Sequence, residues 1–216
     1  MAVAVMSPRR KQATAAAIDN KNVVSQPLDY SFMNLTDISE IEGEEPRCLP
    51  GKKKLEKNED EKYAVGCLKL NNNMLTDLKT LHSTVEKVLV DPLALTWMDL
   101  SFNQLSVIDP TLCDYENLQI LYLHGNDISN VSEVDKLTPL QKLRKLSLHG
   151  NPMDTTKEYR FYVLFHLPQL TNFDMSAVTK STEPPQRHGN RGTLAKRNAR
   201  NSRRTNVVTN RKQTGQ

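Results

Sequence analysis

The stretch LQILYLHGN at residues 118–126 decides the fold, because its arrangement of apolar residues around an asparagine occurs four times along the chain. Leucine stands eight, five and three positions before Asn126, and isoleucine stands two positions after it. Apolar residues fill the same places around each of four aligned asparagines: Asn73, Asn103, Asn126 and Asn151. Self-similarity at a period of about 20–50 residues predicts a solenoid, whose units bury their apolar side only by stacking on one another.

The two apolar residues that precede each asparagine by five and three positions indicate a short strand. Side chains alternate between the two faces of a strand, so both of these residues face the interior of the coil. Asparagine has two N–H donors and a carbonyl acceptor, and can satisfy backbone groups where the chain leaves the strand. We therefore predict short parallel strands along the concave face and a buried asparagine ladder formed by Asn73, Asn103, Asn126 and Asn151.

The intervals between these asparagines are 30, 23 and 25 residues, which leaves little room for helix on the convex side. This compact pattern resembles the leucine-rich-repeat proteins, in the class typified by the small regulatory subunit of nuclear protein phosphatase one. The longer first interval carries apolar residues at helical spacing, with Ser83 and Glu86 matching a capping box. We expect one true helix there.

The residues after Asn151 indicate a terminal cap. Thr155 and Glu158 match a second capping box, and apolar residues at helical spacing follow them. Phe173 and Met175 then occupy the two leucine positions of a further strand. The stretch resembles the cap that closes the open apolar end of a leucine-rich-repeat protein. The predicted fold class is therefore α/β, a leucine-rich-repeat solenoid of four repeats with a C-terminal cap and disordered tails.

Charge changes sharply along the chain, from a net −4 over residues 64–179 to a net +9 over residues 180–216. A mildly acidic body thus carries a basic tail. We predict five parts, which are a disordered tail at 1–25, an N-terminal segment with a charged linker at 26–63, the repeats at 64–151, the cap at 152–180 and a basic disordered tail at 181–216.

Several short segments resemble one family of small leucine-rich-repeat proteins. They are QPLDYSF at 26–32, EEPR at 44–47, DLSFN at 99–103, LHGN at 123–126 and 148–151, and NPM at 151–153. The resemblance covers roughly residues 26–180, and neither the first 25 residues nor the basic tail has a counterpart. It implies a cytoplasmic, non-enzymatic protein connected with cilia, and it supplies no catalytic residue.

The sequence carries no motif for catalysis, cofactor binding or a metal. His124 and His149 hold equivalent positions in adjacent repeats and should stack, but a metal site needs about three or four ligands. Asp99 and Asp174 are three repeats apart, too far for a catalytic pair. No apolar run approaches the ~18–20 residues that span a bilayer. We therefore expect a protein that is not an enzyme and that has no cofactor, metal or membrane contact.

The outward-facing strand positions form a candidate site for a protein partner. Its residues are Trp97, Asp99, Ile120, Tyr122, His124 and Lys145. Tryptophan and tyrosine are enriched at binding hot spots, and Trp97 is the only tryptophan in the chain. In a competing interpretation, residues 28–45 cover Trp97 within the same chain. That segment could instead cover the N-terminal end of the solenoid and bury Val65 and Leu68.

The basic tail contains a cluster of cationic residues: Lys196, Arg197, Arg200, Arg203 and Arg204. It fits a nuclear-import signal, a nucleic-acid arm, a contact with an acidic surface such as a tubulin tail, or a solubilising tail. The leading hypothesis is a cytoplasmic protein–protein adaptor or scaffold in cilia or axonemes. The alternatives are a nuclear or nucleic-acid-associated module that uses the tail and, by fold analogy alone, a phosphatase regulatory subunit.

Overall fold

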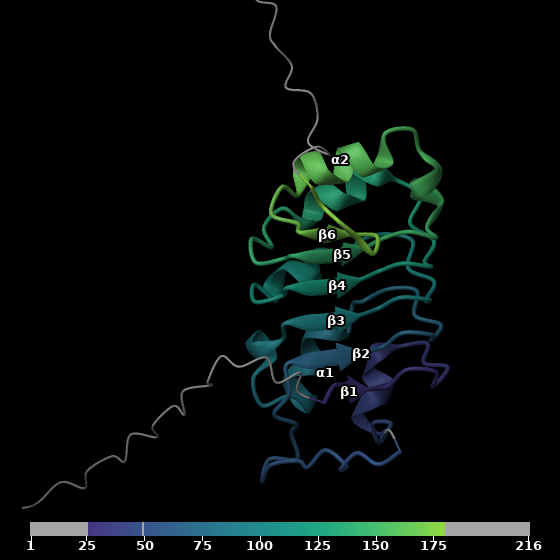
Figure 1. Ribbon diagram of the computed structural model, residues 1–216. Coiled ribbons are helices and arrows are strands. Elements are labelled where there is room, and N and C mark those ends of the chain that lie inside the picture. Colours follow the sequence, from purple (N-terminus) through teal and green to yellow (C-terminus); the bar gives the residue numbers. More distant parts are fainter. Residues whose placement is uncertain (1–25, 49, 180–216) are drawn as a thin grey trace, which may run out of the picture.

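The computed structural model describes residues 26–48 and 50–179, and one sheet runs through the whole of this part. Seven strands follow one another in sequence order, and Figure 1 shows this stack from β1 to β6. Strands β1 to β6 are parallel, and β7 is antiparallel to β6. The strands are β1 (Leu28–Asp29), β2 (Cys67–Lys69), β3 (Trp97–Asp99), β4 (Ile120–Tyr122), β5 (Lys145–Ser147), β6 (Asn172–Phe173) and β7 (Ser176–Ala177).

The register of the sheet places equivalent repeat positions side by side. Met98 pairs with Leu121, Leu121 with Leu146, and Leu146 with Phe173. All four side chains are buried, with at most 1% of their surface exposed. Because each turn of the chain contacts the next through this column, the predicted leucine-rich-repeat solenoid with short parallel strands is confirmed.

Short helices form the convex side. The two α-helices are α1 (Leu81–Val88) and α2 (Tyr159–His166). The 3-10 helices are η1 (Ile38–Glu42), η2 (Pro92–Ala94), η3 (Pro110–Asp114), η4 (Val131–Leu137) and η5 (Pro152–Thr155). Helix α1 lies in the longest interval, where a helix was predicted, and the shorter intervals have room only for 3-10 turns.

Both predicted capping boxes are wrong, because the helices begin elsewhere. Helix α1 starts after Thr80, so Ser83 is already inside the helix and its hydroxyl donates to the Thr80 carbonyl. Thr155 ends η5, and its hydroxyl donates to the Pro152 carbonyl. Helix α2 starts after Glu158, whose backbone is left-handed with φ of 69°.

The N-terminal segment adds a partial repeat to the end of the sheet. Leu28 pairs with Leu68, and the Tyr30 N–H donates to the Lys69 carbonyl at 2.9 Å. Leu28, Tyr30 and Leu35 are buried at the spacing of the repeat, with Met33 in the asparagine position. Helix η1 packs against α1. Residues 28–45 therefore cover the solenoid end, where Leu68 is fully buried and Val65 half-buried; β2 separates β1 from β3, the strand of Trp97.

The C-terminal cap closes the opposite end, where α2 lies in Figure 1. Val163 and Leu167 of this region are fully buried. Met175 does not occupy a strand position, so this part of the prediction is wrong. The chain instead reverses at Asp174 and Met175, both left-handed with φ of 48° and 60°, and enters β7. Met175 is 59% exposed.

No helix within the described ranges is both long and apolar enough to cross a membrane. The predicted tails at 1–25 and 181–216, with the cationic cluster from Lys196 to Arg204, lie outside the described residues.

Candidate functional site

The four asparagines position the strands that carry the candidate site. The Oδ1 atom of Asn126 accepts the Leu105 N–H at 3.0 Å. Its Nδ2 donates to the carbonyls of Leu100 and Leu123, at 3.0 and 2.9 Å. Asn103 and Asn151 bond in the same way to their own and the preceding turn. Each buried amide thus joins two successive turns of the coil.

The residue before each asparagine is left-handed, which turns the chain sharply off the concave face. In the third and fourth repeats it is glycine, with φ of 67° at Gly125 and 73° at Gly150. In the second repeat it is Phe102, with φ of 53°. Left-handed backbone costs an L-residue roughly 1–2 kcal/mol, whereas glycine adopts it freely. The glycine of the LHGN motif therefore serves this turn.

Replacing Gly125 with alanine should destabilise the fold by more than the backbone cost alone. A Cβ atom there would lie 2.7 Å from Cδ1 of Phe102, which covers this glycine. We expect a loss above about 1–2 kcal/mol in urea unfolding. Gly51→Ala is the matched control, because Gly51 has φ of +78° but nothing within 4 Å. Equal losses in both variants would show that the Phe102 ring does not restrict this position.

Aromatic rings form a continuous track over β3 and β4 and the turns that follow β3, β4 and β5. The ring centroids of Trp97 and Tyr122 are 6.2 Å apart, and those of Tyr122 and His124 are 5.9 Å apart. His124 stacks on His149 at 4.7 Å with an interplanar angle of 11°. Phe102 meets the His124 ring edge-on at 5.1 Å. We call these five residues the aromatic track.

The structure brings the six predicted partner-binding residues together: five lie on β3, β4 and β5, and His124 lies just after β4. Trp97 pairs in register with Ile120, and Ile120 with Lys145. Both Trp97 and Ile120 are half-buried, while Lys145 is exposed. Asp99 pairs with Tyr122, and His124 follows on the same side of the strand. The set thus combines a half-buried apolar centre with polar and charged neighbours.

Electrostatics within the site follow from burial. Burial, and the negative charge of Asp99, raise the pKa of Tyr122. Burial and the adjacent His149 lower the pKa of His124. Its imidazole is therefore neutral near pH 7, and its buried Nδ1 atom has no hydrogen-bond partner among the residues that the structure describes. The Trp97 Nε1 is likewise buried, and it has no hydrogen-bond partner within the described ranges.

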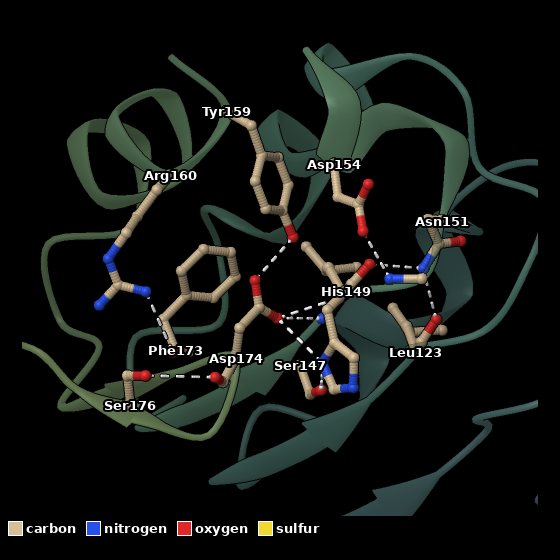
Figure 2. A network of polar contacts seen from close by, with 12 residues as sticks. Leu123, Ser147, His149, Asn151, Asp154, Tyr159, Arg160, Phe173, Asp174 and Ser176 are labelled. Atoms are coloured by element: carbon tan, nitrogen blue, oxygen red, sulfur yellow. Dashed lines mark hydrogen bonds and ion pairs between the residues drawn. The ribbon is translucent and has the colours of Figure 1, made fainter. Parts of the chain in front are cut away.

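Asp174 closes the C-terminal end of the site, as Figure 2 shows. Its Oδ1 accepts the N–H groups of Leu148 and His149, at 2.7 and 3.0 Å. Its Oδ2 accepts the Tyr159 hydroxyl at 3.0 Å, and burial together with Asp174 raises the pKa of Tyr159. The side chain thus satisfies backbone donors at the edge of β5, where the chain turns away. Asp174 is a structural residue of the cap.

Phe102 is the residue of the aromatic track that alternation along the strands does not reveal. It lies one residue beyond the outward-facing strand positions and is 52% exposed. Phe32 holds the same place in the N-terminal partial repeat, with φ of 59° and 62% exposure. In both places the left-handed backbone belongs to the turn that takes the chain off the concave face. The sequence does offer one signal for this residue, which is that phenylalanine stands where the later repeats have glycine.

The arrangement supports binding through ring contacts, hydrogen bonds and a few charges. Within the described part of the chain, no group of three or more histidine, cysteine, aspartate or glutamate side chains is placed to hold a metal ion. His124 and His149 stack as the repeat spacing predicts, as neighbouring positions of two turns.

Known proteins share this pattern of residues. A family model described as leucine-rich repeat matches residues 94–201. Leucine-rich repeat-containing protein 51 of Macaca mulatta is 47% identical over 162 residues, which cover 75% of this chain and 83% of that protein. The Homo sapiens protein of that name is 46% identical over the same shares. Leucine-rich repeat-containing protein 23 of Xenopus tropicalis is 39% identical over 37% of this chain and 23% of that protein.

Two solved structures contain chains that are similar to this one. The Drosophila melanogaster SNF/U2A' complex contains a chain that is 24% identical, with a TM-score of 0.47, covering 62% of this chain and 73% of that one. The Mex67 LRR domain from Chaetomium thermophilum is 26% identical, with a TM-score of 0.41, covering 49% and 76%.

Proposed function

Because the chain belongs to the leucine-rich repeat family that includes leucine-rich repeat-containing protein 51, we propose that it is a non-enzymatic adaptor that binds a protein partner on its concave face. The observation that carries this proposal is the aromatic track. Its rings are held in contact with one another across three successive turns of the solenoid, from Trp97 to His149. Leucine-rich repeats are in general interaction modules, and extended concave surfaces are what such solenoids use for binding.

The composition of the site supports a protein partner. Interface centres are enriched in aromatic residues and are surrounded by polar groups. Trp97, Tyr122 and Ile120 form such a centre, with Lys145 exposed beside it. The rings are fixed by the sheet, so binding would not have to order them first, and a rigid site loses less entropy on association.

We also propose a cytoplasmic location in cilia or axonemes. This part of the proposal rests on the family resemblance over residues 26–180 alone. A tagged full chain expressed in ciliated cells should concentrate along the ciliary shaft, and a purely nuclear signal would contradict this location.

Replacing Trp97 with alanine tests the adaptor proposal. The full chain, Trp97→Ala and Leu93→Ala are each used to capture proteins from an extract of ciliated tissue. Leu93 is the control because it is 57% exposed and lies in η2, away from the strands. For a partner retained by the wild type and Leu93→Ala, Trp97→Ala should raise the Kd roughly 30-fold, or about 2 kcal/mol.

The melting midpoint separates a binding role of Trp97 from a role in packing. Trp97 is half-buried on the concave side, so the variant should unfold at nearly the wild-type temperature. A clear fall in the midpoint, with the same proteins captured, would assign Trp97 to the core and contradict the proposal.

The alternative of a nucleic-acid-associated module is favoured by one observation, the net charge of +9 over residues 180–216. Contacts of cationic residues with phosphates release counterions, so such binding weakens steeply with salt. Binding of duplex RNA or DNA that falls steeply with salt, and is lost when Arg203 and Arg204 become glutamine, would support this alternative. An aromatic concave interface should depend little on salt.

A further inference from the structure

Asp99 is a buried carboxylate on the concave face, and none of the residues that the structure describes forms an ion pair with it. It is 8% exposed. Its Oδ1 accepts both the N–H and the hydroxyl of Ser101, at 3.1 and 2.6 Å, while no hydrogen bond to its Oδ2 occurs within residues 26–48 and 50–179. Asp99 Oδ2 is not among the buried polar atoms that lack a partner, so solvent reaches this oxygen. A hydrogen-bonding position on this oxygen is therefore open to a ligand.

The equivalent carboxylate in β1 is Asp29, and its ion pair shows which kind of partner Asp99 could bind. Asp29 binds the Ser31 N–H in the same way, and its Oδ2 pairs with the Lys69 ammonium at 3.0 Å. Burial alone would raise the pKa of Asp29, but the bonds from Ser31 and Lys69 hold it below the ordinary value. Lys69 lies between the two carboxylates in register and is engaged by Asp29. In the described part of the chain, Asp99 takes part in no ion pair, although the same side chain in β1 does.

Two aromatic rings stand beside Asp99. Trp97 is two residues earlier on β3, on the same face, and Tyr122 is the register partner of Asp99 on β4. Their planes are inclined at 76°, so they present adjacent walls at a steep angle. The Asp99 charge acts on Tyr122, since it contributes to the raised pKa of that phenol. Aromatic faces attract cations, and Trp does so most strongly.

We propose that Asp99, Trp97 and Tyr122 form a receptor for an arginine side chain of the protein partner. A guanidinium group can donate to the Asp99 Oδ2 and at the same time lie against a ring, because it is planar and weakly hydrated. An acidic side chain would meet the unpaired Asp99 charge and be repelled. This inference rests on the proposed function and adds the chemistry of the residue that the concave face selects.

The emission of Trp97 offers a direct test, because it is the only tryptophan in the chain. The full chain is titrated with hexa-arginine and, separately, with hexa-glutamate at constant ionic strength. Hexa-arginine should change the emission saturably and hexa-glutamate should not. Asp99→Asn keeps an acceptor for Ser101 but removes the charge, and should weaken hexa-arginine binding by about tenfold or more.

Asp109→Asn is the matched control. It removes the same charge from the N-cap of η3, on the convex side, and asparagine caps helices as well as aspartate does. It should bind hexa-arginine like the wild type. Tyr122→Leu, which keeps Asp99 but removes one ring, should also bind more weakly, and it provides a second reading if Asp99→Asn unfolds.

Three outcomes would overturn the inference. They are no saturable response to hexa-arginine, an equal response to hexa-glutamate, and wild-type affinity in both Asp99→Asn and Tyr122→Leu. Failure of this inference can be distinguished from failure of the adaptor proposal. If Trp97→Ala loses its protein partner while Asp99→Asn and Tyr122→Leu both bind hexa-arginine with wild-type affinity, the concave interface stands and the arginine receptor does not. If Trp97→Ala retains every captured protein, the concave interface itself is contradicted.

Discussion

Ending the chain at Asn151 should abolish cooperative folding. The shortened chain loses α2, β6 and β7, which cover the last repeat. Leu146 then loses Phe173, its neighbour in the buried column, and the N–H groups of Leu148 and His149 lose the Asp174 carboxylate. An open apolar end beside a free strand edge favours aggregation or a loosely packed state.

Size-exclusion chromatography and thermal unfolding followed by circular dichroism would measure this loss. The control is the chain that ends at residue 179, which keeps the whole cap and lacks only the basic tail. It should elute from the column as a monomer and unfold in one transition. A soluble fragment ending at Asn151 that unfolds cooperatively would show that the fourth repeat does not need the cap.

The sequence predicts the solenoid well because the repeat depends on local alternation. Leu121 and Leu146 are buried, in register and on the same face, as their spacing from Asn126 and Asn151 requires. The outward-facing side chains between them follow from the same alternation. The sequence therefore places Trp97 beside Ile120 and diagonal to Tyr122, and the register of β3 and β4 agrees.

The ends of the solenoid could not be predicted as well. The spacing of apolar residues there is similar to that of the repeats, but the backbone conformation or the asparagine differs. Phe173 and Met175 match the paired leucines, yet two left-handed residues reverse the chain after Phe173. At the other end Leu28, Tyr30 and Leu35 match the repeat, but Met33 stands in place of the asparagine. The C-terminal match therefore predicts a strand position that does not form, and the N-terminal partial repeat is hard to recognise. In both places the pattern alone does not show where the chain turns.

The candidate site could likewise be predicted only in part. Alternation identifies which side chains face outward, but not which of them already have partners. Lys69 lies in register between Asp29 and Asp99, and only the structure shows that it pairs with Asp29. Alternation does not reveal Phe102, because this residue lies beyond the strand, in the left-handed turn.

Replacing Asn126 with alanine should lower the free energy of unfolding by about 1–3 kcal/mol, the cost of leaving a buried backbone group unsatisfied. The main loss is the acceptor of the Leu105 N–H. The two carbonyls that Asn126 binds keep a second donor, because Leu100 also accepts from Asn103 and Leu123 from Asn151. Urea unfolding would measure the loss, with Asn172→Ala as control; this strand residue makes no side-chain hydrogen bond within the described ranges.

This sharing of donors predicts a ranking along the ladder. Asn151→Ala removes the acceptor of the Ile128 N–H and the donor to the Leu148 carbonyl, which no further asparagine replaces. The carbonyl of Leu123 still accepts from Asn126. Two orphaned groups in place of one should make Asn151→Ala more destabilising than Asn126→Ala by about 1 kcal/mol or more. The opposite order, or a wild-type midpoint for Asn126→Ala, would contradict a ladder whose stability comes from amides shared between successive turns.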